Sequence, residues 1–514
     1  MKRDKDQRHR GRASASFLRL HSKMIGAGFI VWGIAVFCGF VYFCWANWPF
    51  ELDDALIYQR YVRNLLNGHG LVFNENERFN ALSSPLFTYL LLIGSLFAPS
   101  VHAAAMTLSV LSWLGLLFLT AALFGKRLSK MALFILFSML VSSHYFYETF
   151  GLESLLSFAL ILLALFLYEK HYDFALGIVA ALAILTRGEN VLCFLVMLAE
   201  FYRSKREFPG PRVFIIPALL LGGHFIFHYW YFGSWMPATL FAKVAQGESG
   251  LWPKFWQVDH IFSRYIELLP GWFYVFATPL LLLGLKPLAR FTAGRILMLY
   301  AVFYFVFYAA LGIPAYGWYY VPIVYFVYLA TVFGCYELDL FTRKLGRLTK
   351  GTIMTIGVLI YVFFIKAQVA FSYRALPVPP PSESYRSIGD WIAHNTPPGS
   401  KVASLEVGAL GWYSDRYIVD ILGVTSPYNA QYLAKRRFRK FLQRYSPDFI
   451  LFHEPLWPQE ISVRHLLKSG KYERVEEFPY TSFGLIMRRP EPSQVEPKKI
   501  RSRAEGLNHL QDEP

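Results

Sequence analysis

Apolar segments long enough to cross a lipid bilayer recur along the first 370 residues of the chain. A helix needs about 20 mostly apolar residues to cross the hydrocarbon core. The first such segment, residues 24–46, follows a basic stretch and ends in the sequence WANWPF, so it predicts a retained span rather than a cleaved signal peptide. Ten further segments have the same character: 101–124, 131–146, 153–168, 174–186, 190–203, 212–232, 270–286, 294–312, 318–335 and 351–371.

A shorter apolar segment, residues 84–98, has only about 15 residues and carries Pro85 near its start. If it crossed the membrane, the basic loops that follow would face outside, whereas Lys and Arg prefer the cytoplasmic side. We therefore expect this segment to dip into the outer interface and return. This leaves eleven spans, a cytoplasmic N-terminus and an external C-terminal part. The basic loops then placed inside are 125–130, 203–212, 286–295 and 343–351.

The pattern changes after residue 371. The sequence PVPPPSESY (377–385) is typical of a stiff linker. Beyond it, short apolar runs alternate with helical patterns, which predicts a small α/β domain. Strands are expected at 401–405, 417–422 and 448–452, and helices at 387–395 and 430–445.

The predicted fold class is therefore an α-helical polytopic membrane protein with an added α/β domain. Its expected parts are a basic cytoplasmic tail (1–23), a transmembrane domain (24–371), an extracytoplasmic α/β domain (372–490) and a disordered polar tail (491–514).

The composition agrees with a membrane protein. Of 514 residues, 55% are hydrophobic and 17% are charged, against about 25% charged in soluble domains. A formal charge of +16 could attract nucleic acid, but the basic residues lie largely in short loops between apolar segments, where they orient the chain. We therefore expect the lipid bilayer, and no nucleic acid, as a partner. No glycine motif for nucleotides is present, so no nucleotide cofactor is expected.

Charged residues that orientation does not explain are concentrated on the predicted outer surface, first in FELDDALIYQRYVRNLLNGHG (50–70). On a helix at about 100° per residue, positions 54–67 separate into two faces, as expected of a helix lying in the membrane interface. The apolar face has Tyr58, Val62, Leu65 and Leu66, and the polar face has Gln59, Arg60, Arg63, Asn64 and Asn67.

Asp53 and Asp54 stand at the start of this helix. One explanation is that they only cap it, because aspartate binds the free N–H groups at a helix start. The other is that at least one carboxylate acts on a substrate, because ionisable groups close to hydrocarbon are costly and usually serve a function.

Several short motifs occur along the chain in an order that resembles a known family. The first loop contains D-D-A-x-I, R-Y-x-x-N-L, G-x-G-L-V-F-N, E-R and S-P-L, and the chain continues with GLES (151–154), LTRGEN (185–190) and GSWMPATLFAK (233–243). This order resembles the GT-C glycosyltransferases, in particular bacterial lipid-linked-sugar transferases of the mycobacterial arabinofuranosyltransferase type. The resemblance covers roughly residues 47–245.

The resemblance implies a membrane enzyme that takes a sugar from a polyprenyl-phosphate donor. It would deliver the sugar to a cell-envelope glycan, lipid or protein outside the bacterial cytoplasmic membrane. Asp54 would be the base that activates the acceptor hydroxyl, with Asp53 as its partner, and the pair could instead hold a divalent cation.

Further site residues follow from the same resemblance and from their chemistry. Glu153 would contact the acceptor or a cation, or it is simply a first-turn acid. Arg187 and Glu189 could also pair with each other, and Lys243 could be an interfacial lysine. The full set is donor-phosphate ligands Arg60, Arg63, Arg187 and Lys243, acceptor or supporting residues Glu189, Asn74 and Arg78, and lone histidines His69 and His144 that we interpret as packing or turn residues.

The chain also departs from the family pattern. Asn80 and Ala81 replace an acidic residue and a glycine, and AYGWYYVP (315–322) has no arginine where relatives often have a glycine-arginine pair. These altered motifs leave an inactive transferase-like scaffold as an alternative. A transporter or flippase of lipid-linked saccharides is a further alternative. The nearly charge-free spans favour a one-sided active site over a transport pathway.

The C-terminal domain is expected to fold separately and to modulate acceptor binding without supplying the base. Its Asp415 and Asp420 lie in EVGALGWYSDRYIVD (406–420), where turn and strand-edge roles are expected.

Overall fold

The computed structural model of the chain describes residues 30–257, 273–342, 366, 381–477 and 483–489. The predicted basic tail and polar tail, and all of the predicted last span except residue 366, lie outside the described residues. The predicted span 270–286 is described from residue 273 onward.

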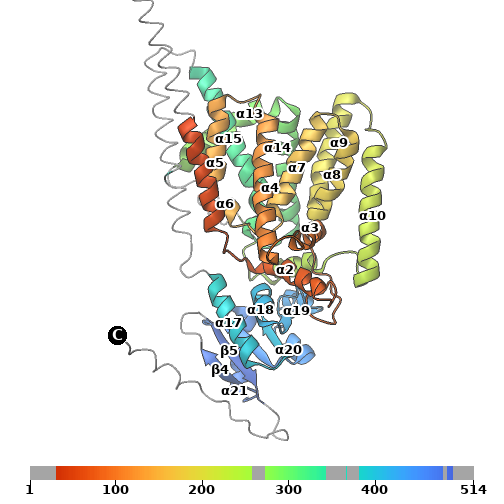
Figure 1. Cartoon of the computed structure of the whole chain (residues 1–514), viewed down its shortest axis with the longest axis vertical. Coiled ribbons are helices and arrows are strands. Elements are labelled where there is room, and N and C mark those ends of the chain that lie inside the picture. The colour runs from red at the N-terminus through yellow and green to blue at the C-terminus, as the bar shows by residue number, and fades with distance from the viewer. Residues whose placement is uncertain (1–29, 258–272, 343–365, 367–380, 478–482, 490–514) are drawn as a thin grey trace, which may run out of the picture.

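A bundle of apolar helices forms one part of the molecule (Figure 1). Among the described residues, four helices are long and apolar enough to cross a membrane: Val101–Phe124, Arg212–Phe232, Thr292–Leu311 and Gly317–Thr342. The bundle comprises Ile30–Ala46, α4 (Val101–Phe124), α5 (Lys130–Ser142), α6 (His144–Tyr147), α7 (Ser154–Glu169), α8 (Asp173–Thr186), α9 (Val191–Lys205), α10 (Arg212–Phe232), α13 (Phe273–Ala289), α14 (Thr292–Leu311) and α15 (Val321–Thr342).

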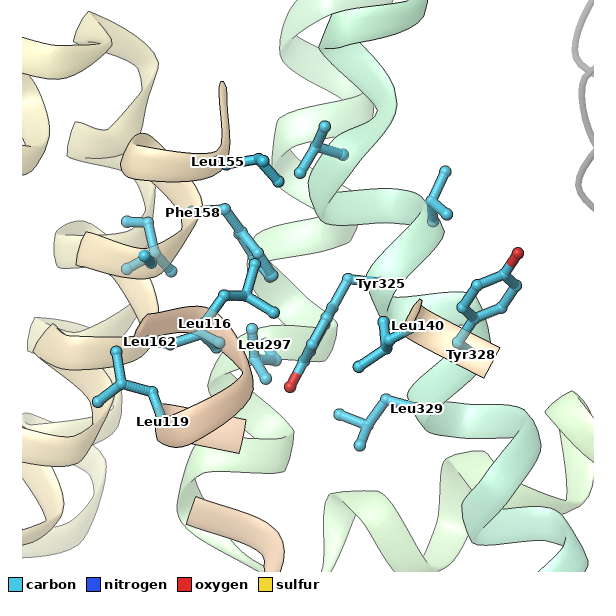
Figure 2. Close-up of a cluster of buried hydrophobic side chains, with 14 of the residues drawn as sticks. Leu116, Leu119, Leu140, Leu155, Phe158, Leu162, Leu297, Tyr325, Tyr328 and Leu329 are labelled. Atoms are coloured by element: carbon cyan, nitrogen blue, oxygen red, sulfur yellow. The ribbon is translucent and has the colours of Figure 1, made fainter. Parts of the chain in front are cut away.

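The interior of the bundle is packed with leucine and aromatic side chains from α4, α5, α7, α14 and α15, as Figure 2 shows. Tyr325 lies in the middle of this cluster and is fully buried. Its hydroxyl would be costly there without a partner, and it hydrogen bonds to Thr120 at 2.8 Å. Tyr328 is bonded in the same way to Ser143 at 3.1 Å.

Three of the predicted inner loops meet at the end of the bundle away from the strands (Figure 1). Arg127 pairs with Glu169 at 2.8 Å, and the backbone N–H of Ala293 donates to the same carboxylate. Arg295 and Arg203 share Glu200. This common end is what the orientation argument requires of these loops.

The segment predicted to dip into the interface forms α3 (Pro85–Ser95), which lies beside α2 (Asp53–Leu66) in Figure 1. Its 11 residues give a length of about 16 Å at 1.5 Å per residue, about half the hydrocarbon thickness. This length agrees with the prediction that the segment does not cross.

A five-stranded sheet with helices lies at the other end of the molecule (Figure 1). The strand order is β2-β1-β3-β5-β4, with β1 parallel to β2 and β3, and β5 antiparallel to β3 and β4. The elements are α17 (Pro381–Asn395), β1 (Lys401–Ser404), α18 (Val407–Ser414), β2 (Tyr417–Asp420), α19 (Asn429–Ala434), α20 (Lys440–Tyr445), β3 (Phe449–His453), α21 (Ser462–Lys468), β4 (Tyr472–Glu477) and β5 (Phe483–Arg488).

Two predictions for this region were wrong in detail. The segment read as a linker is partly helical, because α17 begins at Pro381 and proline is well tolerated in the first turn of a helix. The single basic helix is two helices, broken where Arg436 adopts a positive φ of 51°. The Arg436 guanidinium donates to the carbonyl of Ser249 at 2.7 Å, a contact with the membrane part that no local pattern reveals.

Helix α2 lies between the bundle and α18 (Figure 1). Its two-faced pattern predicted a helix lying in the membrane interface, and the structure buries Gln59, Arg60 and Asn64 of its polar face. One hydrophobic cluster joins the first loop to the C-terminal domain, with Ala55, Val62 and Phe73 on one side and residues such as Leu410 and Ile418 on the other. The domain has its own sheet, but this core is shared.

Candidate functional site

Asp54 and Lys243 meet at the end of the bundle that faces the sheet domain. Asp54 lies in the first turn of α2, and Lys243 lies on α11 (Ala238–Ser249). The Lys243 Nζ is 3.5 Å from Asp54 Oδ2 and 4.0 Å from the centre of the Tyr316 ring. Burial lowers the pKa of Lys243, but the charge of Asp54 and the nearby tyrosines raise it more, so the pKa is raised and the ammonium stays charged.

Arg187 forms the centre of a second group of charges. It caps α8 and bonds Glu153 through Nη1 at 2.8 Å, Glu189 through Nε, and the Tyr308 hydroxyl through Nη2 at 2.7 Å. Glu153 is the residue before α7, and its Oε2 is buried without a partner among the described residues. The Arg187–Glu189 pair expected as an alternative therefore exists, together with two further contacts.

These two groups adjoin each other. The Tyr319 ring lies under the Arg187 guanidinium at 5.0 Å, and its neighbours Tyr316 and Trp318 flank Lys243. Gly151 packs against Ala55 of α2, which brings the GLES motif to the aspartate pair. We call Asp54, Glu153, Arg187, Glu189 and Lys243 the membrane-side cluster.

Asp53 points away from this cluster, into the sheet domain. Its Oδ1 accepts the N–H of Ala409 in α18 at 2.8 Å. A Cβ added at Gly408 would lie 1.8 Å from the Asp53 carbonyl oxygen, so only glycine allows α18 this close to α2. Burial raises the pKa of the Asp53 carboxyl to about 7, and the charge of Asp54 adds to that shift.

Arg60, Arg63 and Asn74 do not join the membrane-side cluster. Arg60 donates to the carbonyl of Arg416 at 2.8 Å, and Arg63 donates to that of Trp412 and pairs with Asp415. Asn74 exchanges two hydrogen bonds with the backbone of Ile418, as a neighbouring strand would. The structure thus places these three residues in the contact between the first loop and the C-terminal domain.

The remaining expected residues lie apart from the membrane-side cluster. Arg78 is exposed and stacks over the Tyr231 ring at 4.7 Å. His69 lies in the turn after α2 beside Glu75, and His144 is buried near Glu148. Asp420 ends β2 and accepts the N–H groups of Leu422 and Thr425, which is the turn role expected of it.

The described residues do not suit a divalent cation at the aspartate pair. No group of three or more His, Cys, Asp or Glu side chains that could hold a metal ion occurs in the described part of the chain. Asp53 is bound by a backbone N–H, and Asp54 already faces the ammonium of Lys243. One carboxylate bound by a backbone N–H and another that faces an ammonium are a poor donor set for a hard cation.

Sequence reasoning missed the aromatic residues that hold the cations. Tyr308, Tyr316, Trp318 and Tyr319 contact Arg187 or Lys243, and the first of these stands at the end of α14. The signal was present in AYGWYYVP (315–322), an unusually aromatic run, which we noted only for its lack of an arginine.

The chain is similar in structure to solved membrane proteins. The chain aligns with ArnT from Cupriavidus metallidurans bound to undecaprenyl phosphate with a TM-score of 0.55 at 11% identity, covering 89% of this chain and 97% of that one. The apo form of ArnT gives 0.53 at 12% identity, with 89% and 98% covered. The chain therefore has the fold of ArnT.

In sequence, the chain is similar to two curated proteins named terminal beta-(1->2)-arabinofuranosyltransferase. The one from Mycobacterium tuberculosis is 32% identical over 238 residues, which are 40% of this chain and 37% of that protein. The one from Corynebacterium glutamicum is 41% identical over 80 residues, 15% of this chain and 11% of that protein. The chain thus matches well under half the length of these relatives, and the resemblance suggested by its motifs is confirmed.

A family model described as a domain of unknown function (DUF8728) matches residues 375–496. This range contains the sheet domain.

Proposed function

We propose that this chain is a membrane glycosyltransferase that transfers a sugar from a polyprenyl-phosphate donor to an acceptor in the cell envelope. The observation that carries the proposal is the contact between the Asp54 carboxylate and the Lys243 ammonium at the end of the bundle. A carboxylate can take a proton from an attacking hydroxyl, and an ammonium beside it can neutralise a departing phosphate. The fold of ArnT, solved with undecaprenyl phosphate, and the arabinofuranosyltransferase relatives support this reading.

In this reaction the acceptor oxygen forms a bond to the anomeric carbon, and the bond from that carbon to the phosphate oxygen breaks. Asp54 takes the hydroxyl proton, and polyprenyl phosphate leaves with its charge balanced by Lys243. Asp54 suits the role of base because its side chain is 33% exposed, whereas Glu153 is 6% exposed and Glu189 10%. Those two carboxylates are held by Arg187.

The other expected residues then divide into two groups. Each guanidinium nitrogen of Arg187 is hydrogen-bonded to a protein group, so Arg187 positions Glu153 and Tyr308. Its positive charge also lies against the Tyr319 ring. The unpartnered oxygen of Glu153 would accept a hydrogen bond from a hydroxyl of the acceptor substrate. Arg60, Arg63 and Asn74 fix the sheet domain over the first loop, and Asp53 does the same through Ala409.

We further propose that the protein lies in the bacterial cytoplasmic membrane, with the basic loops inside and the membrane-side cluster outside. In a variant whose four cysteines are replaced, a cysteine at the exposed position Glu248 should react with a membrane-impermeant thiol reagent in intact cells. A cysteine at Lys126 should not react. The reverse pattern would place the site inside.

The proposed reaction is tested with the full chain in liposomes. The donor is a radiolabelled polyprenyl-phosphoryl arabinofuranose, and the acceptor is an octyl oligo-arabinofuranoside. Asp54→Asn should reduce transfer by at least about 100-fold, the usual loss when a general base is removed.

The matched control is Asp173→Asn, since Asp173 also stands in the first turn of a helix but lies at the start of α8. It should retain normal transfer. Because asparagine caps a helix about as well as aspartate, near-normal transfer by Asp54→Asn would reduce Asp54 to a helix-start residue and refute the proposed base.

A further inference from the structure

The sheet domain has a topological switch point. From β1 the chain passes through α18 to β2 on one side, and from β2 it passes through α19 and α20 to β3 on the other side of β1. In open α/β sheets, such a reversal leaves a crevice beyond the carboxyl ends of the two diverging strands, and ligands bind there. At these ends stand Glu406, two residues after β1, and His453, the last residue of β3.

Charged and aromatic side chains meet in this place. His453 Nδ1 is 2.9 Å from Glu460 Oε1, and its Nε2 is 3.6 Å from Glu406 Oε1. Burial lowers the pKa of His453, but the two carboxylates outweigh burial and raise the pKa to about 9. Both ring nitrogens therefore face carboxylates, and neither is left for a metal or a phosphate. We call Glu406, His453, Trp457 and Glu460 the sheet-edge cluster.

Trp457 supplies a rigid, open aromatic face. One face of its ring is stacked on His453, with centroids 3.8 Å apart and an angle of 8°, while 41% of the residue remains exposed. Glu460 fixes the loop, because its Oε2 accepts the N–H groups of both Trp457 and His453. Little conformational freedom would be lost when a ligand covers this ring.

The sheet-edge cluster lies next to the proposed catalytic residues. Glu406 directly precedes α18, the helix whose Ala409 N–H binds Asp53. The charge of Glu406 also acts on Asp53 and on Tyr316, the ring that covers Lys243. A ligand on the sheet-edge cluster would therefore reach toward Asp54.

The chemistry of the cluster indicates what it binds. The Glu406 carboxylate receives a hydrogen bond from the Tyr385 hydroxyl and faces His453 through Oε1. Its Oε2 is buried with no hydrogen-bond partner among the described residues, and an ionised carboxylate can only accept hydrogen bonds. Two carboxylates around one imidazolium leave a net negative charge, which repels phosphate. A sugar fits both features, because its hydroxyls donate to carboxylates and its C–H face packs on an indole ring.

We propose that the sheet-edge cluster is the acceptor subsite and that it binds a neutral saccharide chain, with one sugar ring over Trp457. This proposal rests on the proposed function, and it selects a glycan from the possible classes of acceptor. Glu406 accepts a hydrogen bond from a hydroxyl of the bound glycan. Glu460 and His453 hold the Trp457 ring in place.

The first test is binding, measured with the full chain in nanodiscs and octyl oligosaccharides of arabinofuranose and of mannose as probes. All variants carry Asp54→Asn and no donor is added, so that no turnover occurs. At least one oligosaccharide should bind, and Trp457→Ala should weaken it by about tenfold or more. Trp457→Phe should restore most of the binding, because it keeps an aromatic face.

Ile461→Ala is the matched control, since Ile461 is an exposed apolar residue four positions further on and has no ring. It should bind like the parent. Equal binding by Trp457→Ala and Ile461→Ala, or no binding of any probe to the parent, would overturn the acceptor subsite.

The second test is kinetic and separates the two proposals. With Asp54 intact, Trp457→Ala should raise the KM for the acceptor about tenfold and leave the KM for the donor unchanged. An unchanged acceptor KM overturns the subsite even where transfer itself is normal. Absent transfer by the wild-type chain, with Trp457-dependent glycan binding intact, would instead refute the proposed reaction and leave the glycan site standing.

Discussion

The membrane-side cluster and the sheet-edge cluster contain similar charged and aromatic residues, but they differ in which hydrogen-bonding groups stay available to a ligand. In each, a cation lies beside at least one carboxylate and against an aromatic ring. The ammonium of Lys243 has three N–H donors, and Asp54 is the carboxylate beside it. The imidazolium of His453 has two, and each faces a carboxylate.

The difference lies in what each cluster leaves for a ligand. Beside Lys243, N–H donors remain, and these suit a phosphate, which only accepts hydrogen bonds. Around His453, what remains is a carboxylate oxygen and an open indole ring, which suit a neutral polyol. The charged residue types are similar, so it is the groups around each cation that distinguish the proposed donor side from the proposed acceptor side.

Removing the charge of Lys243 should have the largest effect. Lys243→Met keeps much of the side chain's volume and its contact with the Tyr316 ring but removes the ammonium. We expect transfer to fall by about 100- to 1,000-fold, as when one electrostatic group that stabilises a transition state is lost. Donor turnover is measured at saturating acceptor.

Lys205→Met, at the end of α9, serves as the control and should leave turnover unchanged. Glycan binding should stay normal in Lys243→Met. If that variant lost glycan binding and kept turnover, the assignment of the two clusters would have to be exchanged.

Separating the two clusters should have an intermediate effect. Gly408→Val places side-chain atoms where the Asp53 carbonyl now lies, and forced overpacking of this kind costs about 1–3 kcal/mol. We expect transfer to fall by about tenfold or more, with faster hydrogen exchange in α2 and α18. The amount of protein in the membrane should be unchanged, because the bundle has its own core.

The control is Gly222→Val in α10, where an added Cβ would meet no atom within 4 Å. It should behave as the wild type. If Gly408→Val left the hydrogen exchange of α2 unchanged, α18 would not be the element that holds the two clusters together.

The smallest effect is expected from the charge of Asp53. Its folded-state pKa of about 7 lies above the value of about 3.9 for a free aspartate, so the folded state binds the proton more tightly. The stability from this group is fully present below about pH 4 and is lost as the pH rises through 7. Thermal unfolding of the wild type should therefore occur at a lower temperature at pH 8 than at pH 5.5.

Asp53→Asn still accepts the Ala409 N–H but cannot ionise, so it should lack this part of the pH dependence. The informative quantity is the difference between the two proteins at each pH, since other groups titrate in both. Parallel curves for the two proteins would mean that Asp53 is not buried against α18.

Much of the membrane-side cluster could be predicted from the sequence. Asp54, Glu153, Arg187 and Lys243 are far apart in the chain, yet assigning each loop to one side of the membrane put them on one surface, and the structure brings them together. That argument works because apolar length and loop charge are properties of single segments.

The contacts between domains could not be predicted in this way. A helical period shows that Arg60 and Arg63 share a polar face, but not that carbonyls of the C-terminal domain, rather than water, cover it. Glu406, His453 and Trp457 become neighbours only once the strand order is known. They were missed because Asp415 and Asp420 stand out more in the sequence of that region.

The bond between Asp53 and Ala409 joins positions 356 residues apart. At a synthesis rate of about 5–20 residues per second, α2 emerges roughly 20–70 s before the helix that covers it. During that interval the buried faces of Arg60 and Gln59 and the apolar residues of the first loop have no partner from the later domain. Completion of the contact between the first loop and the sheet domain is therefore one of the last events in biogenesis. A chain released early would present an uncovered, aggregation-prone first loop to the cell's quality-control proteases.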